Sequence, residues 1–319
     1  MTTETVARFA TYVATLGRGP GRSRALTRVE AADAMRMLLA GEADPIQVGA
    51  FLMLLRYRGE DPDEVSGLVE AARETMCWPG LNVALDWPSY GAGRSRGAPW
   101  FLLAALALGR AGFPVLMHGS NEFSGSMTVA QALALLSLTP ATGAAAAARG
   151  LASGGFAYIP VASLNPVFAD LLGLRRLLGL RSPLNTVARL LNPADAPAGV
   201  DGVFHPPYIE THLAAAERLG RARLVVLKGG GGEVERNPAK PVTAHLWDAS
   251  TGRSEIALAA IAPFAAGPEP DFAAVWSGAV ADPAIEARVV ATIALGLLAL
   301  RRGGDAEAQI VWESRRAVR

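Results

Sequence analysis

Polar groups suited to holding an anion are concentrated in one apolar stretch of this sequence. The stretch carries Arg175, Arg176, Arg181, Asn185 and Asn192 among leucines and prolines. Guanidinium and amide groups that leave water must be hydrogen-bonded, so an apolar setting destabilises them unless they bind a partner. Because the planar fork of arginine matches a carboxylate or a phosphate, the stretch predicts an anion site. The alternative is a pair of helices whose arginines extend their charged ends into solvent.

Three other stretches have the composition of phosphate-binding turns, because consecutive backbone N–H groups in glycine-rich turns can surround an anion. They lie near Gly91, near His118 and along the glycines that follow Lys228. The alternatives are a histidine bonded to nearby backbone at His118 and a flexible surface hairpin at the glycine run. Together with the arginine stretch, the positions at which we expect phosphate or nucleic-acid contacts are Gly91, Gly93, Arg94, Arg96, His118, Gly119, Ser124, Ser126, Arg175, Arg181, Asn185, Lys228, Gly229, Gly230, Gly231, Gly232 and Arg236.

The residues before position 80 are predicted to form capped helices. Thr27 and Glu30 have the spacing of a capping box, in which each side chain bonds the other residue's backbone N–H. Asp44 and Asp61 each precede a proline, which is typical of the first residues of a helix. Three amphipathic helices joined by short loops predict a small helical bundle domain over residues 1–80.

From residue 81 onward, short apolar runs alternate with helical stretches rich in alanine and leucine. This alternation predicts a large α/β domain with a mostly parallel central sheet over residues 81–319. Residues 165–193 interrupt it as a helical segment. The expected strands are Leu81–Leu85, Pro114–Met117, Ala157–Pro160, Leu224–Leu227 and Val242–Trp247, and the expected helices between them lie near Trp100–Ala111, Val129–Leu136, Ile209–Leu219 and Ile285–Leu300.

The composition excludes several classes of protein. Apolar residues make up 51% of the chain, so it can bury a large core. Its 30 Lys and Arg against 29 Asp and Glu lack the overall basic charge of many nucleic-acid binders, which leaves only local basic patches. The single cysteine, Cys77, excludes an intrachain disulfide, and the apolar run Val289–Leu300 is too short to span a bilayer. We expect a cytoplasmic protein without a signal peptide or membrane contact.

The predicted bundle helices carry more apolar surface than three helices can bury among themselves. Phe51, Met53, Leu54 and Leu68 are the residues concerned. Exposed apolar surface of this kind favours association, and most soluble oligomers are symmetric. We therefore expect a homodimer built through the helical domain.

The arginine stretch resembles a sequence block of the anthranilate phosphoribosyltransferase and nucleoside phosphorylase class, glycosyltransferase family 3. The block reads R-x-x-L-G-x-R-T-x-F-N-x-x-G-P-x-x-N-P-A. The N-terminal helices resemble the helical domain of the same class. The resemblance implies that residues 165–193 pack with the N-terminal helices and that ligands bind in the cleft between the two domains. The residues that fall in register with the block are Arg175, Gly179, Arg181, Asn185, Asn192 and Pro193.

The chain departs from this class where the class holds diphosphate and magnesium. The first phosphate loop, G-T-G-G-D in the class, has Arg94 and Ser95 in place of its last glycine and its aspartate. The second, K-H-G-N-R, has Met117 in place of lysine. In the third, Val234 replaces the aspartate of a magnesium-holding Asp-Glu pair and Glu235 keeps the glutamate. The resemblance thus implies magnesium only if the chain is a transferase, held weakly by Glu235, or by Glu233 if the loop shifts.

Three functions remain open. The departures are similar to those of the YbiB-type paralogues, which implies a protein that binds nucleic acid, including DNA, without sequence preference through an arginine-lined cleft. The second possibility is an active phosphoribosyltransferase that transfers phosphoribose from phosphoribosyl pyrophosphate to an unknown acceptor, with a phosphorylated small molecule as its partner. The third is a small-molecule sensor or scaffold.

Overall fold

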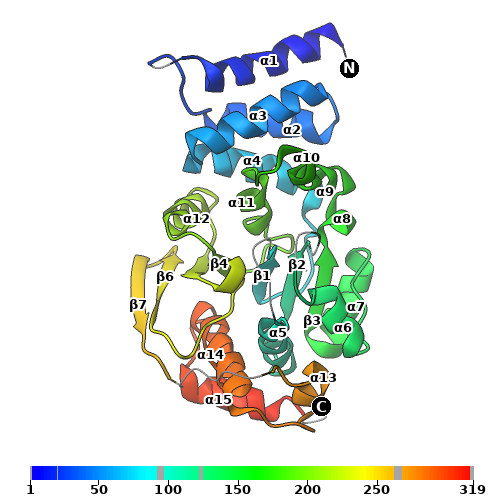
Figure 1. Cartoon of the computed structure of the whole chain (residues 1–319), viewed down its shortest axis with the longest axis vertical. Helices are drawn as coiled ribbons and strands as arrows, with labels where there is room; N and C mark the ends of the chain where they lie inside the picture. The colour runs from blue at the N-terminus through cyan, green and yellow to red at the C-terminus, as the bar shows by residue number, and fades with distance from the viewer. Residues whose placement is uncertain are drawn as a thin grey trace.

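The computed structural model describes residues 2–19, 21–91, 97–120, 122, 125–261 and 268–316. Figure 1 shows a helical bundle at the N-terminal end above a larger α/β part. The bundle contains α1 (Thr3–Gly17), α2 (Arg28–Leu39), α3 (Pro45–Arg58) and α4 (Pro62–Met76). The predicted α/β fold class with a small helical domain is therefore confirmed.

Side-chain caps define where the bundle helices begin. Thr27 and Glu30 form the predicted capping box of α2, and Asp44 forms one with Gln47 at the start of α3. Asp61 accepts hydrogen bonds from the backbone at the start of α4. The sequence analysis did not predict α1, although Thr2 caps it and Phe9 and Leu16 are buried.

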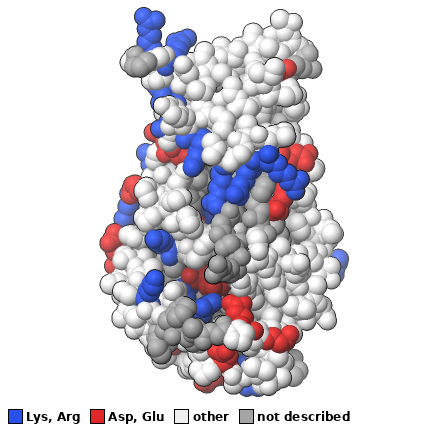
Figure 2. Space-filling model, viewed as in Figure 1, with Lys and Arg blue, Asp and Glu red and all other residues white. Residues whose placement is uncertain are grey.

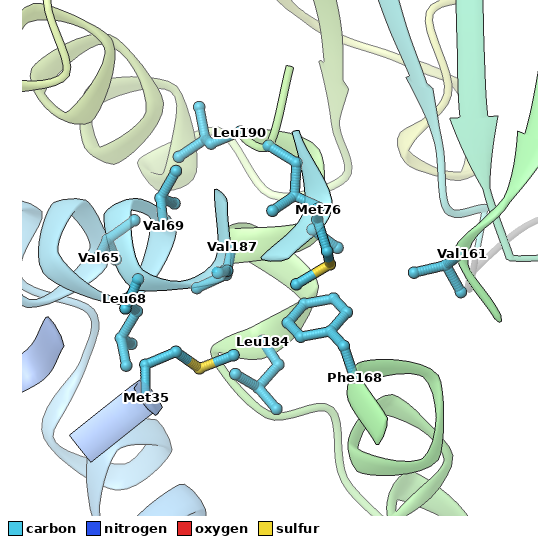
Figure 3. Packing of buried hydrophobic residues seen from close by; sticks show 14 of the residues in the cluster. Met35, Val65, Leu68, Val69, Met76, Val161, Phe168, Leu184, Val187 and Leu190 are labelled. Atoms are coloured by element: carbon cyan, nitrogen blue, oxygen red, sulfur yellow. The ribbon is translucent and has the colours of Figure 1, made fainter. Parts of the chain in front are cut away.

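A second group of helices returns to the bundle from the middle of the chain. It contains α8 (Val161–Leu164), α9 (Pro166–Gly173), α10 (Arg175–Leu178) and α11 (Leu184–Arg189). Figure 3 shows Phe168 of α9 and Leu184 and Val187 of α11 facing Met76 and Leu68 of α4. The side chains of these helices bury one another in a shared core. This packing places the arginine stretch directly beneath the bundle.

The sheet has seven strands in the order β3-β2-β1-β4-β5-β6-β7. The first five pair in parallel, and the last two pair antiparallel at one edge, so the predicted, mostly parallel sheet is confirmed. The strands are β1 (Leu85–Ser89), β2 (Val115–Gly119), β3 (Phe156–Pro160), β4 (Ala198–Val203), β5 (Arg223–Lys228), β6 (Val242–Asp248) and β7 (Gly252–Leu258).

Two hydrophobic cores lie on the two faces of this sheet. On β5, Val225 and Leu227 face one core while Leu224 and Val226 face the other, as the alternation of a strand requires. The core that contains Val226 is continuous with the interior of the helical bundle. The other helices of the α/β part are α5 (Trp100–Arg110), α6 (Val129–Leu135), α7 (Ala144–Gly154), α12 (Pro207–Arg218), α13 (Phe272–Ser277), α14 (Pro283–Ala299) and α15 (Asp305–Ser314).

The strand predictions failed in three places. Strand β1 begins at Leu85, where the predicted strand ended. The prediction stopped there because Asp86 and Pro88 are unusual in a buried strand. Strand β4 was missed because its glycines resemble a turn. A Cβ at Gly202 would lie 2.3 Å from the backbone oxygen of Glu233, so close approach requires glycine there. Strand β7 was missed because it is a largely exposed edge strand with few apolar residues.

The apolar residues chosen for a dimer contact are largely internal. Phe51 is 0% and Leu68 1% exposed, which corrects their assignment to a surface. Other apolar side chains of the bundle do face outward, with Ile46 83% and Tyr57 91% exposed on α3. No helix among the described residues is long and apolar enough to cross a bilayer.

Replacement of Gly67 by alanine should destabilise the bundle by about 1–3 kcal/mol, a typical cost of overpacking a core. Gly67 lies in α4, where a Cβ would stand 2.1 Å from the backbone oxygen of Arg28. Gly49→Ala is the matched control, because the nearest atom to a Cβ there is 4.0 Å away in Leu178. It should gain up to about 1 kcal/mol from helix propensity. Urea unfolding of both variants measures the difference, and equal stabilities would contradict this packing.

Candidate functional site

A cavity of about 290 Å³ lies between the helical bundle and the α/β part. We call it the arginine pocket, because guanidinium groups from α3, α10, α11 and the turn after α10 converge on it. Figure 2 shows basic side chains gathered where the bundle meets the α/β part. The residues that line it are Arg56, Glu60, Arg175, Gly179, Leu180, Arg181, Ser182, Asn185, Thr186, Arg189, Val203, Phe204, His205, Tyr208, His212 and Gly232.

The turn between α10 and α11 brings Arg175 and Arg181 to the same cavity. Gly179 ends α10 with φ +69°, a left-handed conformation that favours glycine and reverses the chain direction. Asn185 then donates from its side chain to the backbone oxygen of Ser182 at 3.0 Å, which closes the turn. The predicted site residues Arg175, Arg181 and Asn185 therefore do lie together.

The electrostatics of the pocket favour an anion. Burial lowers the pKa of the Arg181 guanidinium, and three neighbouring guanidinium groups lower it further. They belong to Arg175, Arg189 and Arg56. Like charges brought together in a partly desolvated space repel one another, and a negatively charged ligand would relieve that repulsion.

A buried carboxylate holds two residues of the pocket wall. Asp201, within β4, is 0% exposed and accepts from Arg189 Nη1 at 3.0 Å. Its other oxygen bonds Nδ1 of His212 on α12. A carboxylate that bonds one ring nitrogen of a histidine fixes the orientation of the ring. The sheet thereby positions both α11 and α12 around the cavity.

The remaining wall contains residues that the sequence analysis did not assign to a site. Arg56 donates to the hydroxyl of Tyr208 at 2.5 Å and so bridges α3 and α12. His205, interpreted as a loop residue, and His212, which has no motif context, both line the pocket. Glu60 lines it from the turn before α4. The available signal was a run of arginines and a glutamate at the end of α3, which also reads as an ordinary solvated helix end.

Several predicted phosphate contacts lie elsewhere or outside the described residues. Gly93, Arg94, Arg96 and Ser124 are among the residues that the structure does not describe. Ser126 lies on a different surface, lining a separate groove with Gly97 and Phe272. Of the glycine run, Gly232 lines the arginine pocket, while Gly229, Gly230 and Gly231 do not line it.

His118 and Gly119 have structural roles, which corrects their assignment to phosphate. His118 is 0% exposed, with Nε2 3.2 Å from Asp86 and Nδ1 2.9 Å from the hydroxyl of Tyr90. A Cβ at Gly119 would lie 1.9 Å from the backbone oxygen of Ser89, so glycine permits the close pairing of β1 and β2. His118 is therefore an interior residue, as the alternative expected, but its neighbours are side chains rather than nearby backbone.

Arg236 also differs from its prediction. It is 2% exposed and donates to the backbone oxygen of Ala259 at 2.5 Å, so it is part of the interior rather than a cleft wall. Lys228 is exposed at the end of β5 and does not line the arginine pocket. Gly91 packs against Glu233, whose Oε1 would stand 2.3 Å from a Cβ placed there.

The N-terminus of α5 already holds two carboxylates. The backbone N–H of Phe101 donates to Glu235 at 3.1 Å, and that of Ala98 donates to Glu269 at 2.7 Å. Arg288 lies 3.7 Å from Glu235 and 3.9 Å from Glu269. A helix N-terminus attracts anions, and here side chains of the chain itself satisfy it.

This arrangement does not fit a magnesium site. Both oxygens of Glu235 face donors, and Glu233 is 2% exposed against Gly91. Magnesium needs oxygen ligands that are free to point at one centre. Within the described part of the chain, no group of three or more histidine, cysteine or acidic side chains converges as metal ligands would. The predicted weak metal roles of Glu233 and Glu235 are therefore not supported by this geometry.

Comparison with known proteins identifies relatives of the whole fold. The helical bundle domain of a glycosyl transferase family matches residues 10–76, and the α/β domain of that family matches residues 101–267. Anthranilate phosphoribosyltransferase of Moorella thermoacetica is 33% identical over 212 residues, which cover 65% of this chain and 62% of that protein. Anthranilate phosphoribosyltransferase 2 of Streptomyces coelicolor is 32% identical over 72% of this chain and 69% of its own length.

Solved structures extend the likeness to nearly the whole chain. The anthranilate phosphoribosyltransferase of Thermus thermophilus superimposes with a TM-score of 0.78 at 25% identity, covering 97% of this chain and 95% of that chain. The Saccharomyces cerevisiae enzyme in complex with PRPP and Mg has a TM-score of 0.75 at 18% identity, covering 97% and 93%. The sequence alignment to the Moorella protein spans less than two thirds of that protein's length.

Asp201→Asn should destabilise the protein by about 3–5 kcal/mol, because it removes the counter-charge of the buried Arg189 guanidinium. The matched control is Glu74→Gln, which breaks an ion pair with Arg36 whose side chains are both 49% exposed. The stability lost in this control should be below about 1 kcal/mol. The midpoints of urea unfolding measure the stability losses of both variants. A D201N protein as stable as E74Q would contradict the role given to Asp201.

Proposed function

This chain belongs to the glycosyl transferase family of these relatives, and we propose that it transfers a phosphoribosyl group from phosphoribosyl pyrophosphate to an anionic acceptor in the arginine pocket. The observation that carries the proposal is the convergence of Arg56, Arg175 and Arg181 on one cavity. The names of the curated relatives describe phosphoribosyl transfer to anthranilate, itself an anion. The Saccharomyces cerevisiae enzyme of the same fold is known in complex with PRPP and Mg.

The dimensions of the pocket limit the acceptor to a small molecule. A volume of about 290 Å³ is at the lower end of the range for ligand pockets and suits one ring with its substituents. The guanidinium groups of Arg175 and Arg181 can hold a carboxylate or phosphate with charge-assisted hydrogen bonds. Tyr208 stays neutral because burial raises the pKa of its hydroxyl, so it adds a polar contact without a charge.

The part of the proposed site that would bind the diphosphate of PRPP, near the N-terminus of α5, is the weaker half. Glu235 occupies the N–H group of Phe101 in the first turn of α5, and Glu269 occupies that of Ala98 just before the helix, so a diphosphate here would have to displace both carboxylates. Displacing a carboxylate from a helix N-terminus sacrifices a favourable interaction with the helix dipole. We therefore expect phosphoribosyl transfer to be slow.

Nucleic-acid binding is the second candidate, favoured by basic side chains outside the pocket. Figure 2 shows them along the junction of the two parts and at one end of the bundle. Arg176 is 69% exposed beside the pocket, and Arg18 and Arg22 are exposed in the bundle. A phosphate backbone makes such contacts without sequence preference, and its binding weakens steeply with salt.

Removing two of the pocket's positive charges should weaken binding of a small carboxylate. We expect Arg175→Gln combined with Arg181→Gln to weaken anthranilate at least tenfold by calorimetry, since hydrogen bonds to charged groups contribute about 1.5–3 kcal/mol each. Arg149→Gln is the control, because Arg149 is exposed on α7 and does not line the pocket. The wild type should also release diphosphate from PRPP in the presence of anthranilate and magnesium, faster than the double variant.

The same variants separate the two candidate functions. A short oligonucleotide titrated at several salt concentrations should bind weakly and without change in the double variant if the pocket serves a small acceptor. Tight oligonucleotide binding, with no anthranilate binding, would overturn the transferase proposal and favour the nucleic-acid function. The slope of log affinity against log salt concentration would then give the number of phosphate contacts, at roughly one unit for each contact.

We also propose a homodimer through the outward face of α3, where Ile46, Ala50, Met53 and Tyr57 follow one another at helical spacing. Ile46→Lys combined with Tyr57→Lys should give a monomer by light scattering, because two charges would be buried at the contact. Ile310→Lys, 64% exposed on α15 at the other end of the molecule, is the control and should stay dimeric. A monomeric wild type at micromolar concentration would contradict the proposal.

A further inference from the structure

One carboxyl group stands among the guanidinium groups of the arginine pocket. Glu60 follows Gly59, whose φ of +88° ends α3 and turns the chain toward α4. The side chain lines the pocket, and its Oε2 atom is out of contact with solvent. None of the described residues donates a hydrogen bond to this oxygen. A desolvated acceptor without a donor is unfavourable, and a ligand that supplies one would remove the penalty.

The surroundings of Glu60 raise the pKa of its carboxyl group. Burial raises the pKa of its carboxyl to about 7, although Thr186, His212 and Arg56 all act in the opposite direction. At physiological pH the group therefore exists in both forms. The groups that face it come from α3, α11 and α12, and the wider pocket adds further charges; together they are Arg56, Arg175, Arg181, Thr186, Arg189, His205, Tyr208 and His212.

We propose that Glu60 is a specificity-determining residue of this pocket: its ionised carboxylate accepts a hydrogen bond from an N–H or O–H group that the anionic acceptor carries beside its charged group. The inference rests on the proposed function, since it requires an anion held by Arg175 and Arg181. It narrows the acceptor class to small amino- or hydroxy-substituted carboxylates or phosphates. A plain anion of the same size is disfavoured, because it sets a second negative charge beside Glu60 and leaves Oε2 without a donor.

Two probes of nearly equal size separate these cases. Benzoate carries a carboxylate alone, and anthranilate carries the same carboxylate with an adjacent amine. Both are fully ionised between about pH 6 and pH 8. As pH rises through this window Glu60 loses its proton, so benzoate should bind more weakly. Anthranilate gains a charged hydrogen-bond acceptor over the same window and should lose much less affinity or none.

The experiment is calorimetric titration of the full-length protein with both probes at about pH 6, 7 and 8. The ratio of the benzoate to the anthranilate dissociation constant should rise about tenfold across this window in the wild type. In Glu60→Gln, which keeps the shape and cannot ionise, the ratio should be flat. The control is Glu255→Gln, because Glu255 lies on β7 paired with His245, away from the pocket, and should behave as the wild type.

Each outcome decides a different question. If the wild type binds neither probe, the proposed function fails and this inference with it. If the wild type binds both probes with a ratio that does not change with pH, the inference is overturned while the anion pocket stands. The wild-type profile alone therefore tests the proposal, even if Glu60→Gln fails to fold. A ratio that rises equally in Glu60→Gln would assign the proton to another group and also overturn the inference.

Discussion

The buried carboxylate of Asp201 holds the walls of the pocket in register. It lies within β4 and binds Arg189 of α11 on one oxygen and His212 of α12 on the other. Helix α11 belongs to the segment that packs under the bundle, and α12 packs on both the sheet and α4. One charge in the sheet therefore connects two helices that line the cavity. Since the carboxylate is fully buried, removal of Arg189 would take away the guanidinium group that balances its charge.

The core explains why this cavity lies between two parts of the chain that are far apart in sequence. The apolar interior of the bundle is continuous with one face of the sheet, through α4, α9 and α11. The arginines sit where that continuous core reaches solvent, so their aliphatic stems can pack while their charged ends meet in the cavity. Packing positions the charges, and their mutual repulsion leaves the cavity ready for an anion.

The sequence predicted the parts of this structure that local rules control, and failed where distant contacts decide. Capping at Thr27 and Asp44 depends on neighbours three residues away, so those helix starts were correct. The arginine block was found because its residues are close in sequence. Glu60 and His212 were missed because they reach the pocket only through the tertiary fold. Arg236 and His118 were misjudged because polarity suggested exposure, while the structure buries both and gives each a hydrogen bond in the interior.

The two halves of the candidate site differ in how their charge is balanced. On the acceptor side, burial and neighbouring guanidinium groups lower the pKa of the Arg181 guanidinium, so the balance of charge is left to a ligand. On the donor side, Glu235 and Glu269 already cap the helix at which a diphosphate would be expected, and Arg288 lies beside both. A helix end that is satisfied internally attracts an anion less than an open one. Affinity for the acceptor can therefore persist while affinity for the donor falls. For this reason binding of a small anion and transfer of phosphoribose are separable properties of this chain, and binding is the one that its described residues favour more strongly.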